Sequence, residues 1–108
     1  MTTFDERENA YEAKFARDEE LRFKAKARRD KALGAWVAAQ LGLTGAAAGD
    51  YAKEILRSDF KHPDDTQLIV AKVLGDFQAK GVPMDERTLK KKLIELMAQA
   101  VAEIEAGR

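Results

Sequence analysis

Few side chains in this sequence are of the types that catalysis requires. His62 is the only histidine and there is no cysteine, so the usual ligand sets for a transition metal are missing. Ser58 is the only serine, and it lacks the glycine-flanked turn that exposes a nucleophilic serine. The carboxylate pairs Glu19-Glu20 and Asp64-Asp65 are typical of solvated or helix-capping positions. We therefore expect no catalytic residue, no metal site and no enzymatic activity.

Two clusters of basic side chains could instead bind an anion. Arg28 and Arg29 belong to the first cluster, and Lys90, Lys91 and Lys92 form the second. These five residues are our candidate contacts for a nucleotide or another anion, because Lys and Arg side chains commonly bind phosphate. No glycine-rich phosphate-binding loop accompanies them. A solvated helix face is the simpler interpretation of both clusters.

The charge balance argues against a nucleic-acid partner. The chain has 19 Lys and Arg and 19 Asp and Glu residues, whereas a general nucleic-acid binder carries a basic surplus. Residues 22–31 alone hold six bases and one acid, so a nucleic-acid adaptor remains an alternative that salt-dependent DNA binding would test.

The first thirty residues have an unusual distribution of charge. Residues 1–20 contain seven acids and three bases, and the basic stretch 22–31 follows directly. A helix over residues 4–31 would be about 42 Å long at 1.5 Å per residue, which exceeds the length of the later helices. Phe4, Tyr11 and Phe15 share a narrow arc of this helix. An overhanging, charged helix with a thin aromatic stripe is typical of helix-in-groove docking, and it can be disordered until it binds.

Glycines and prolines divide the rest of the chain into helical segments. The first helix is predicted to begin at Thr3, to be weakened or bent at Gly34 and to stop at Gly42. A second helix, capped by Thr44, runs to the break at 62–65, and a third runs from there to Gly81. Asp85 is the predicted cap of the fourth. Short connections favour antiparallel neighbours, so we predict an all-α, compact four-helix bundle.

The predicted helices each carry apolar residues at helical spacing. The candidate core residues are Leu33, Trp36, Val37, Leu41, Tyr51, Ala52, Ile55, Leu56, Phe60, Leu68, Ile69, Val73, Leu74, Phe77, Leu89, Leu93, Leu96, Met97, Ala100, Val101 and Ile104. The length of 108 residues fits one domain, with 45% hydrophobic and 35% charged residues. The N-terminus lacks the pattern of a signal peptide and no apolar run approaches 18 residues, so we expect a cytoplasmic protein without direct membrane insertion.

An ordered set of short motifs resembles the ζ-subunit family, the ATPase inhibitors of alphaproteobacterial ATP synthases. The motifs are Phe4-Asp5-Glu6-Arg7-Glu8-Asn9-Ala10-Tyr11-Glu12-Ala13-Lys14-Phe15, Asp18-Glu19-Glu20, Phe23, Ala27-Arg28-Arg29-Asp30-Lys31, Leu33-Gly34, Trp36, Tyr51-Ala52-Lys53-Glu54 and Gly107-Arg108. They cover essentially the whole chain, and residues 64–70 match the pattern least well.

The resemblance implies a protein that inhibits ATP hydrolysis by the F-type ATP synthase. Residues 1–20 would form an inhibitory docking segment, and residues 21–108 would form the four-helix bundle that anchors it. The segment would enter the catalytic head of the enzyme, wedge at a catalytic interface and block rotation in the hydrolytic direction. No cofactor is implied. The protein would be cytoplasmic and peripheral to the inner membrane through the ATP synthase.

Within the docking segment, the residue types suggest two roles for partner contacts. The aromatic residues would be the apolar anchors and the charged residues would set register and selectivity. The candidate partner-binding residues are Phe4, Arg7, Glu8, Tyr11, Glu12, Lys14, Phe15 and Arg17. The main alternative is a small helical module that binds a nucleotide or another protein without inhibiting. A hydrolase is the weakest alternative, because no nucleophile–base pair can be named.

Overall fold

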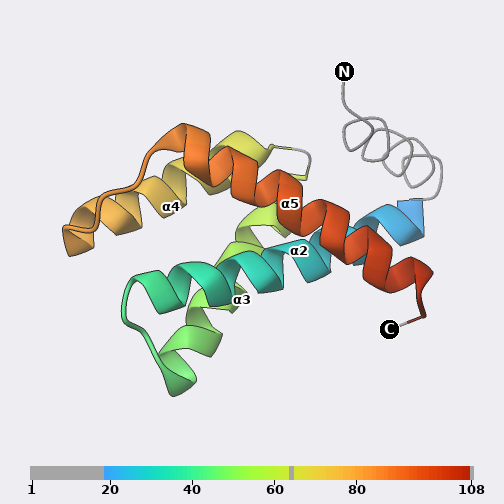
Figure 1. Ribbon diagram of the computed structural model, residues 1–108, viewed down its shortest axis with the longest axis horizontal. Helices are drawn as coiled ribbons and strands as arrows, with labels where there is room; N and C mark the ends of the chain where they lie inside the picture. The colour runs from blue at the N-terminus through green and yellow to red at the C-terminus, as the bar shows by residue number, and fades with distance from the viewer. Residues whose placement is uncertain (1–18, 64, 108) are drawn as a thin grey trace.

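A computed structural model of the chain describes residues 19–63 and 65–107, which form four α-helices (Figure 1). The helices are α2 (Glu19–Gln40), α3 (Gly45–Lys61), α4 (Thr66–Lys80) and α5 (Glu86–Glu105). The predicted all-α class and compact four-helix arrangement are confirmed. The predicted start of the first helix at Thr3 lies outside the described residues.

The helix α2 is the centre of the arrangement. It packs along both α3 and α5, whereas α4 makes smaller contacts with α3 and α5. Figure 1 shows α3 crossing α2, and it places the end of α5 beside the start of α2. The chain therefore pairs two segments from its opposite ends.

Local signals explain where the helices begin and end. Gly81 ends α4 with a left-handed φ of 70°, a conformation that glycine adopts without strain. At the start of α4, the Asp65 side chain accepts a hydrogen bond from the Leu68 N–H at 3.3 Å, and Asp85 accepts one from the Thr88 N–H at 2.6 Å at the start of α5. Thr44 occupies the cap position of α3, but its side chain makes no capping hydrogen bond, so that part of its predicted role is wrong.

The buried apolar residues form two clusters of unequal size. The main core draws on all four helices and consists of Leu33, Val37, Ala38, Leu41, Tyr51, Ile55, Ile69, Val70, Val73, Phe77, Leu89, Leu93 and Leu96. The minor core lies where α2 begins and α5 ends, and it consists of Ala25, Ala100 and Val101, with Leu21, Met97 and Ile104 partly buried against them. Trp36 packs on the main core, with its ring centroid 6.5 Å from that of Phe77.

Gly34 has a role that the sequence did not reveal. The helix α2 continues through it to Gln40. A Cβ atom at this position would lie 2.5 Å from the Cα atom of Ala52 in α3. Gly34 therefore allows the backbones of α2 and α3 to approach closely, which no larger residue would permit.

Two of the predicted core residues are substantially exposed. Phe60 is 53% exposed and Leu68 is 39% exposed. On α3 the buried row is Tyr51, Ile55 and Asp59, at a spacing of four residues. Phe60 follows Asp59 directly and is therefore rotated by about 100° from that row, toward solvent.

Candidate functional site

The predicted docking segment precedes the first described helix. All eight candidate partner-binding residues, from Phe4 to Arg17, lie outside the described residues. The structure does describe the junction: α2 begins at Glu19, and two acidic residues, Glu19 and Glu20, occupy its first turn. Acidic side chains at this end of a helix interact favourably with the helix dipole. Glu20 also pairs with Lys24 at 3.3 Å, as its spacing predicts.

The three consecutive lysines of α5 do not point to one site. Lys90 pairs with Glu86 at 3.0 Å, and Lys91 is exposed without an ion pair to any described residue. The Lys92 ammonium lies 5.2 Å from the ring centroid of Trp36, a cation–π contact. Consecutive helical residues point in directions about 100° apart, which explains their different surroundings.

The two candidate arginines of α2 also have different surroundings. Arg28 lies 3.7 Å from Glu103 of α5, at the surface, whereas Arg29 is only 5% exposed. Arg29 and Lys90 line the same groove between α2, α4 and α5. The structure thus brings two of the five candidate anion contacts together and leaves the other three apart.

Four charged residues meet between α2 and α3, and we call them the ionic cluster: Lys26, Arg29, Asp30 and Asp59. The Arg29 guanidinium donates to Asp30 Oδ1 from Nη2 at 2.9 Å and from Nε at 3.1 Å. Its Nη2 also lies 3.6 Å from Asp59 Oδ2 across the helix interface. Lys26 Nζ lies 3.9 Å from Asp59 Oδ1. Asp30 is completely buried and Asp59 is 9% exposed, so the cluster is an interior feature.

The two carboxyl groups of the ionic cluster, those of Asp30 and Asp59, have fewer hydrogen-bond donors than their oxygen atoms can accept from. Burial, the hydrogen bond to Asp59 and the negative charge of Asp59 together raise the pKa of Asp30 to about 8, although Arg29 acts to lower it. Two buried carboxylate oxygens of the pair, Asp30 Oδ2 and Asp59 Oδ1, have no hydrogen-bond partner among the described residues. A proton held by this pair turns one oxygen into a donor and relieves part of the cost of burial.

Asp59 was not predicted from the sequence as a member of this cluster. Its signal was available, because Asp59 continues the buried row of Tyr51 and Ile55 on α3. An acidic residue on an apolar helix face requires a partner, since an isolated buried charge is costly. Arg29 falls in the apolar arc of the preceding helix, and the structure identifies it as that partner.

A second polar contact joins α3 to α4 at the edge of the main core. The Tyr51 hydroxyl donates to Asp76 Oδ2 at 2.7 Å, and Lys72 bridges Asp76 at 3.1 Å and Glu54 at 3.2 Å. Burial and the Asp76 carboxylate raise the pKa of Tyr51. Burial works to lower the pKa of Lys72, but the hydrogen bonds to Asp76 and Glu54 outweigh it, so that this pKa is raised. The contact is partly open to solvent, unlike the ionic cluster.

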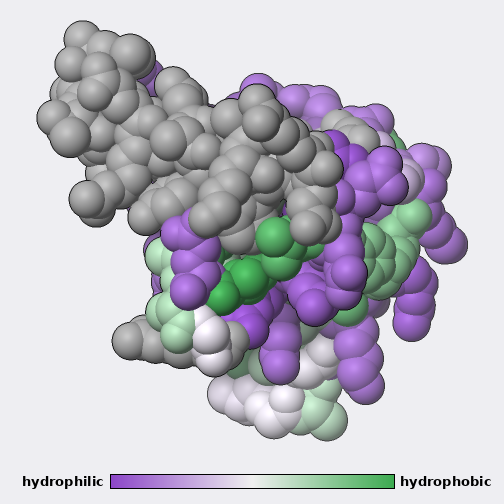
Figure 2. All heavy atoms as spheres, turned by 90° about the vertical axis from the view of Figure 1, so that its right-hand side faces the viewer, coloured by the Kyte–Doolittle hydropathy of each residue, from purple (hydrophilic) through white to green (hydrophobic). Residues whose placement is uncertain are grey.

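The described residues offer little to a metal ion or a catalytic reaction. They contain no group of three or more His, Cys, Asp or Glu side chains that could hold a metal ion, and His62 is exposed. Within the same part of the chain, no helix combines the length and the apolar character needed to cross a bilayer. Viewed from the end where α2 begins, hydrophilic side chains lie beside a small hydrophobic area of the surface (Figure 2).

Comparison with known proteins identifies the family. The family described as ATPase inhibitor subunit zeta matches residues 1–103, a range that includes the predicted docking segment and nearly all of the four helices. Among curated proteins, none matches the chain. The chain belongs to the ATPase inhibitor subunit zeta family, as its sequence motifs indicated, and is therefore a non-catalytic regulator.

Proposed function

We propose that this chain inhibits ATP hydrolysis by the F-type ATP synthase by inserting residues 1–20 at a catalytic interface, where they block rotation. Inhibition of the F-type ATPase is what membership of the family implies, and the mode of inhibition is our proposal. Residues 21–108 act as the anchor. The partner is the catalytic head of the enzyme, so the chain works in the cytoplasm, attached to the ATP synthase at the inner membrane.

One observation best supports separate roles for residues 1–20 and residues 21–108: the family match begins at residue 1. The docking segment is therefore part of what defines the family. In addition, the described residues from Leu21 onward build two apolar cores. A bundle with such cores can anchor a segment that binds a partner.

The chemistry of the segment fits insertion between protein subunits. Phe4, Tyr11 and Phe15 would fill apolar pockets, as buried aromatic side chains do at the centres of interfaces. Five charged residues would fix the register: Arg7, Glu8, Glu12, Lys14 and Arg17.

Deletion of residues 1–19 tests the role of the segment. Full-length and truncated chains would be added to the cognate ATPase head, and ATP hydrolysis measured. We expect only the full-length chain to inhibit, while thermal unfolding shows that the truncated chain keeps its fold. Equal inhibition by both chains would move the inhibitory surface to the bundle and overturn the proposal.

A double variant tests the aromatic anchors. Burying one aromatic ring is worth about 2 kcal/mol, so Tyr11→Ala with Phe15→Ala should weaken inhibition by more than about thirtyfold. Asp5→Ala with Asn9→Ala is the matched control, because it truncates two polar residues of the same segment that are not candidate contacts. An unchanged inhibition constant in the aromatic variant would remove these two anchors from the proposal.

The shared groove of Arg29 and Lys90 favours nucleotide binding as a second candidate function. Amide NMR spectra recorded with increasing ADP or ATP would test it. Shift changes that cluster on α4 and α5 around this groove, and that are lost in Lys90→Ala, would support a nucleotide module. Spectra that do not change would leave the chain as a binder of proteins alone.

A further inference from the structure

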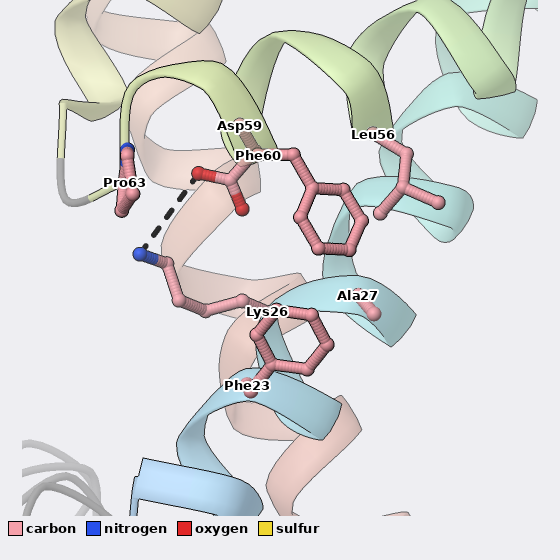
Figure 3. Close-up of a pocket in the computed structure, with 7 residues that line it drawn as sticks. All are labelled: Phe23, Lys26, Ala27, Leu56, Asp59, Phe60 and Pro63. Carbon is pink, nitrogen blue, oxygen red and sulfur yellow. Dashed lines mark ion pairs between the residues drawn. The ribbon is translucent and has the colours of Figure 1, made fainter.

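Two exposed phenylalanine rings lie together at the surface where α2 meets α3. Phe23 and Phe60 are each 53% exposed, and their ring centroids lie 5.0 Å apart at an angle of 59°. Together with Leu56 of α3 and Ala27 of α2 they line a pocket of about 90 Å³ (Figure 3). A monomer gains nothing from large apolar side chains left in water, so a clustered pair of them indicates a surface that a partner covers.

Three cations of α3 line a second depression next to this pocket. Lys53, Arg57 and Lys61 recur at every fourth residue, which places them on one face of the helix, and they line this depression with Leu56 and Phe60. The two depressions therefore share an apolar wall. All three cations are exposed, and none forms an ion pair with another described residue. Like charges at this spacing destabilise a helix unless anions lie nearby.

One ion pair lies in the wall of the pocket. Lys26 and Asp59 form this pair on the side of the pocket nearest Pro63, as Figure 3 shows. Lys53, Arg57 and Lys61 add positive charge along the α3 side of this surface. A complementary partner accordingly has an apolar ridge for the pocket and acidic side chains for the rim.

We propose that this surface, formed by Phe23 and Phe60 with the cations Lys53, Arg57 and Lys61, docks an acidic amphipathic helix of the ATPase head. A groove between two helices accepts the ridge of a third, which is the usual geometry of helix-in-groove recognition. An anionic membrane also attracts basic and aromatic residues, but here the rings line a hollow and do not project toward a flat surface. The inference rests on the proposed function and gives the bundle its own contact with the enzyme.

Charge reversal in the full-length chain tests the rim. Arg57→Glu with Lys61→Glu should raise both the dissociation constant for the immobilised ATPase head and the concentration for half-maximal inhibition by about tenfold, since rim charges steer association. The extent of inhibition at saturation should stay unchanged, because residues 1–20 are intact. Phe60→Ala should weaken binding by a similar factor.

A matched control separates this effect from net charge. Lys80→Glu with Arg87→Glu makes the same change in charge at two exposed cations of α4 and α5, and Lys80, like Lys61, lies in the last turn of its helix. We expect this control to bind within about twofold of the unaltered chain. Equal binding by the two reversal variants would overturn the proposal. Thermal unfolding of both variants confirms that each is folded.

The outcomes also distinguish this proposal from the proposed function. A chain that binds the head through the rim without inhibiting would contradict the proposed function and support the docking surface. A chain that does not bind the head at all would overturn both. Sedimentation with phosphatidylglycerol vesicles that depends on Arg57 and Lys61, while binding to the head does not, would assign the surface to a membrane instead.

Discussion

The two halves of α2 bury different kinds of side chain. The C-terminal half places three apolar residues, Leu33, Val37 and Ala38, in the main core, and Leu41 joins them directly after the helix. The N-terminal half buries Ala25 in the minor core, but it also buries Arg29 and Asp30 against Asp59 of α3. The same helix thus joins its neighbours through apolar packing at one end and largely through charge at the other.

Because of this difference, we expect the stability of the two ends of α2 to respond differently to pH. Apolar burial contributes about 25 cal/mol per Å² and is insensitive to pH. A buried ionic cluster contributes little net stability, because the cost of removing charges from water offsets their attraction, and its balance depends on protonation. We therefore expect the packing of the N-terminal half of α2 to depend more on pH than that of the C-terminal half.

The largest effect should come from truncation in the main core. Ile55→Ala should lower the free energy of unfolding by about 2–5 kcal/mol, because Ile55 is fully buried and a cavity would remain. Ile104→Ala makes the same change at a partly buried position of the minor core and should cost less than half as much. Denaturant unfolding measures both. Equal losses would mean that the two ends are equally well packed.

The next largest effect should be a dependence of stability on pH. The folded chain holds the proton of Asp30 up to about pH 8, whereas the unfolded chain releases it near the ordinary aspartate pKa of 3.8. The folded state thus binds the extra proton between these values, and stability falls as the pH rises, by up to about 1.4 kcal/mol per pH unit.

Asp30→Asn isolates this contribution, because the amide imitates a protonated carboxyl group and does not titrate. Melting temperatures measured from pH 5 to pH 8 should fall more steeply for the unaltered chain than for the variant. Parallel curves would show that the ionic cluster does not bind the extra proton.

Two glycine substitutions should change stability in opposite directions. Gly34→Ala places a Cβ 2.5 Å from the backbone of Ala52, so the helices α2 and α3 must separate, at a cost of about 1–3 kcal/mol. Gly75→Ala, in the middle of α4, meets nothing within 4 Å and should stabilise by about 0.5–1 kcal/mol. Thermal unfolding compares them, and a neutral Gly34→Ala would contradict the close approach of α2 and α3.

The smallest effect should come from the polar contact at the edge of the main core. Tyr51→Phe removes the hydrogen bond to Asp76, and it should cost about 0.5–1.5 kcal/mol because Asp76 keeps its contact with Lys72. The loss should vary little between pH 5 and pH 8. A loss as large as that of Ile55→Ala would place this contact among the main determinants of stability.

Most of the fold could be predicted because its boundaries are encoded locally. Gly81 ends α4 and Asp85 begins α5 through interactions within a few residues, and both appear directly in the sequence. Local patterns could not reveal which helices meet. From the sequence alone, Gly34 resembles a weak point of a helix. Its close approach to Ala52 could not be predicted, because it arises only from the crossing of α2 and α3.

Among the functional features, too, those encoded locally could be predicted and those formed by distant residues could not. The family could be identified from short motifs spread along the chain, because these are read without a structure. The ionic cluster could not be predicted, since Arg29 and Asp59 are thirty positions apart and each alone resembles a surface charge. The exposed position of Phe60 likewise depends on which row of α3 faces α2.

The central position of α2 has a mechanical consequence. If residues 1–20 are held in a rotating enzyme, any force on them enters the bundle at Glu19, the first residue of α2. That helix contacts both α3 and α5, so the load is shared by two interfaces at once. Packed helices separate only when many side chains leave their neighbours. A load on the N-terminal end of the bundle is thus divided between two helix interfaces.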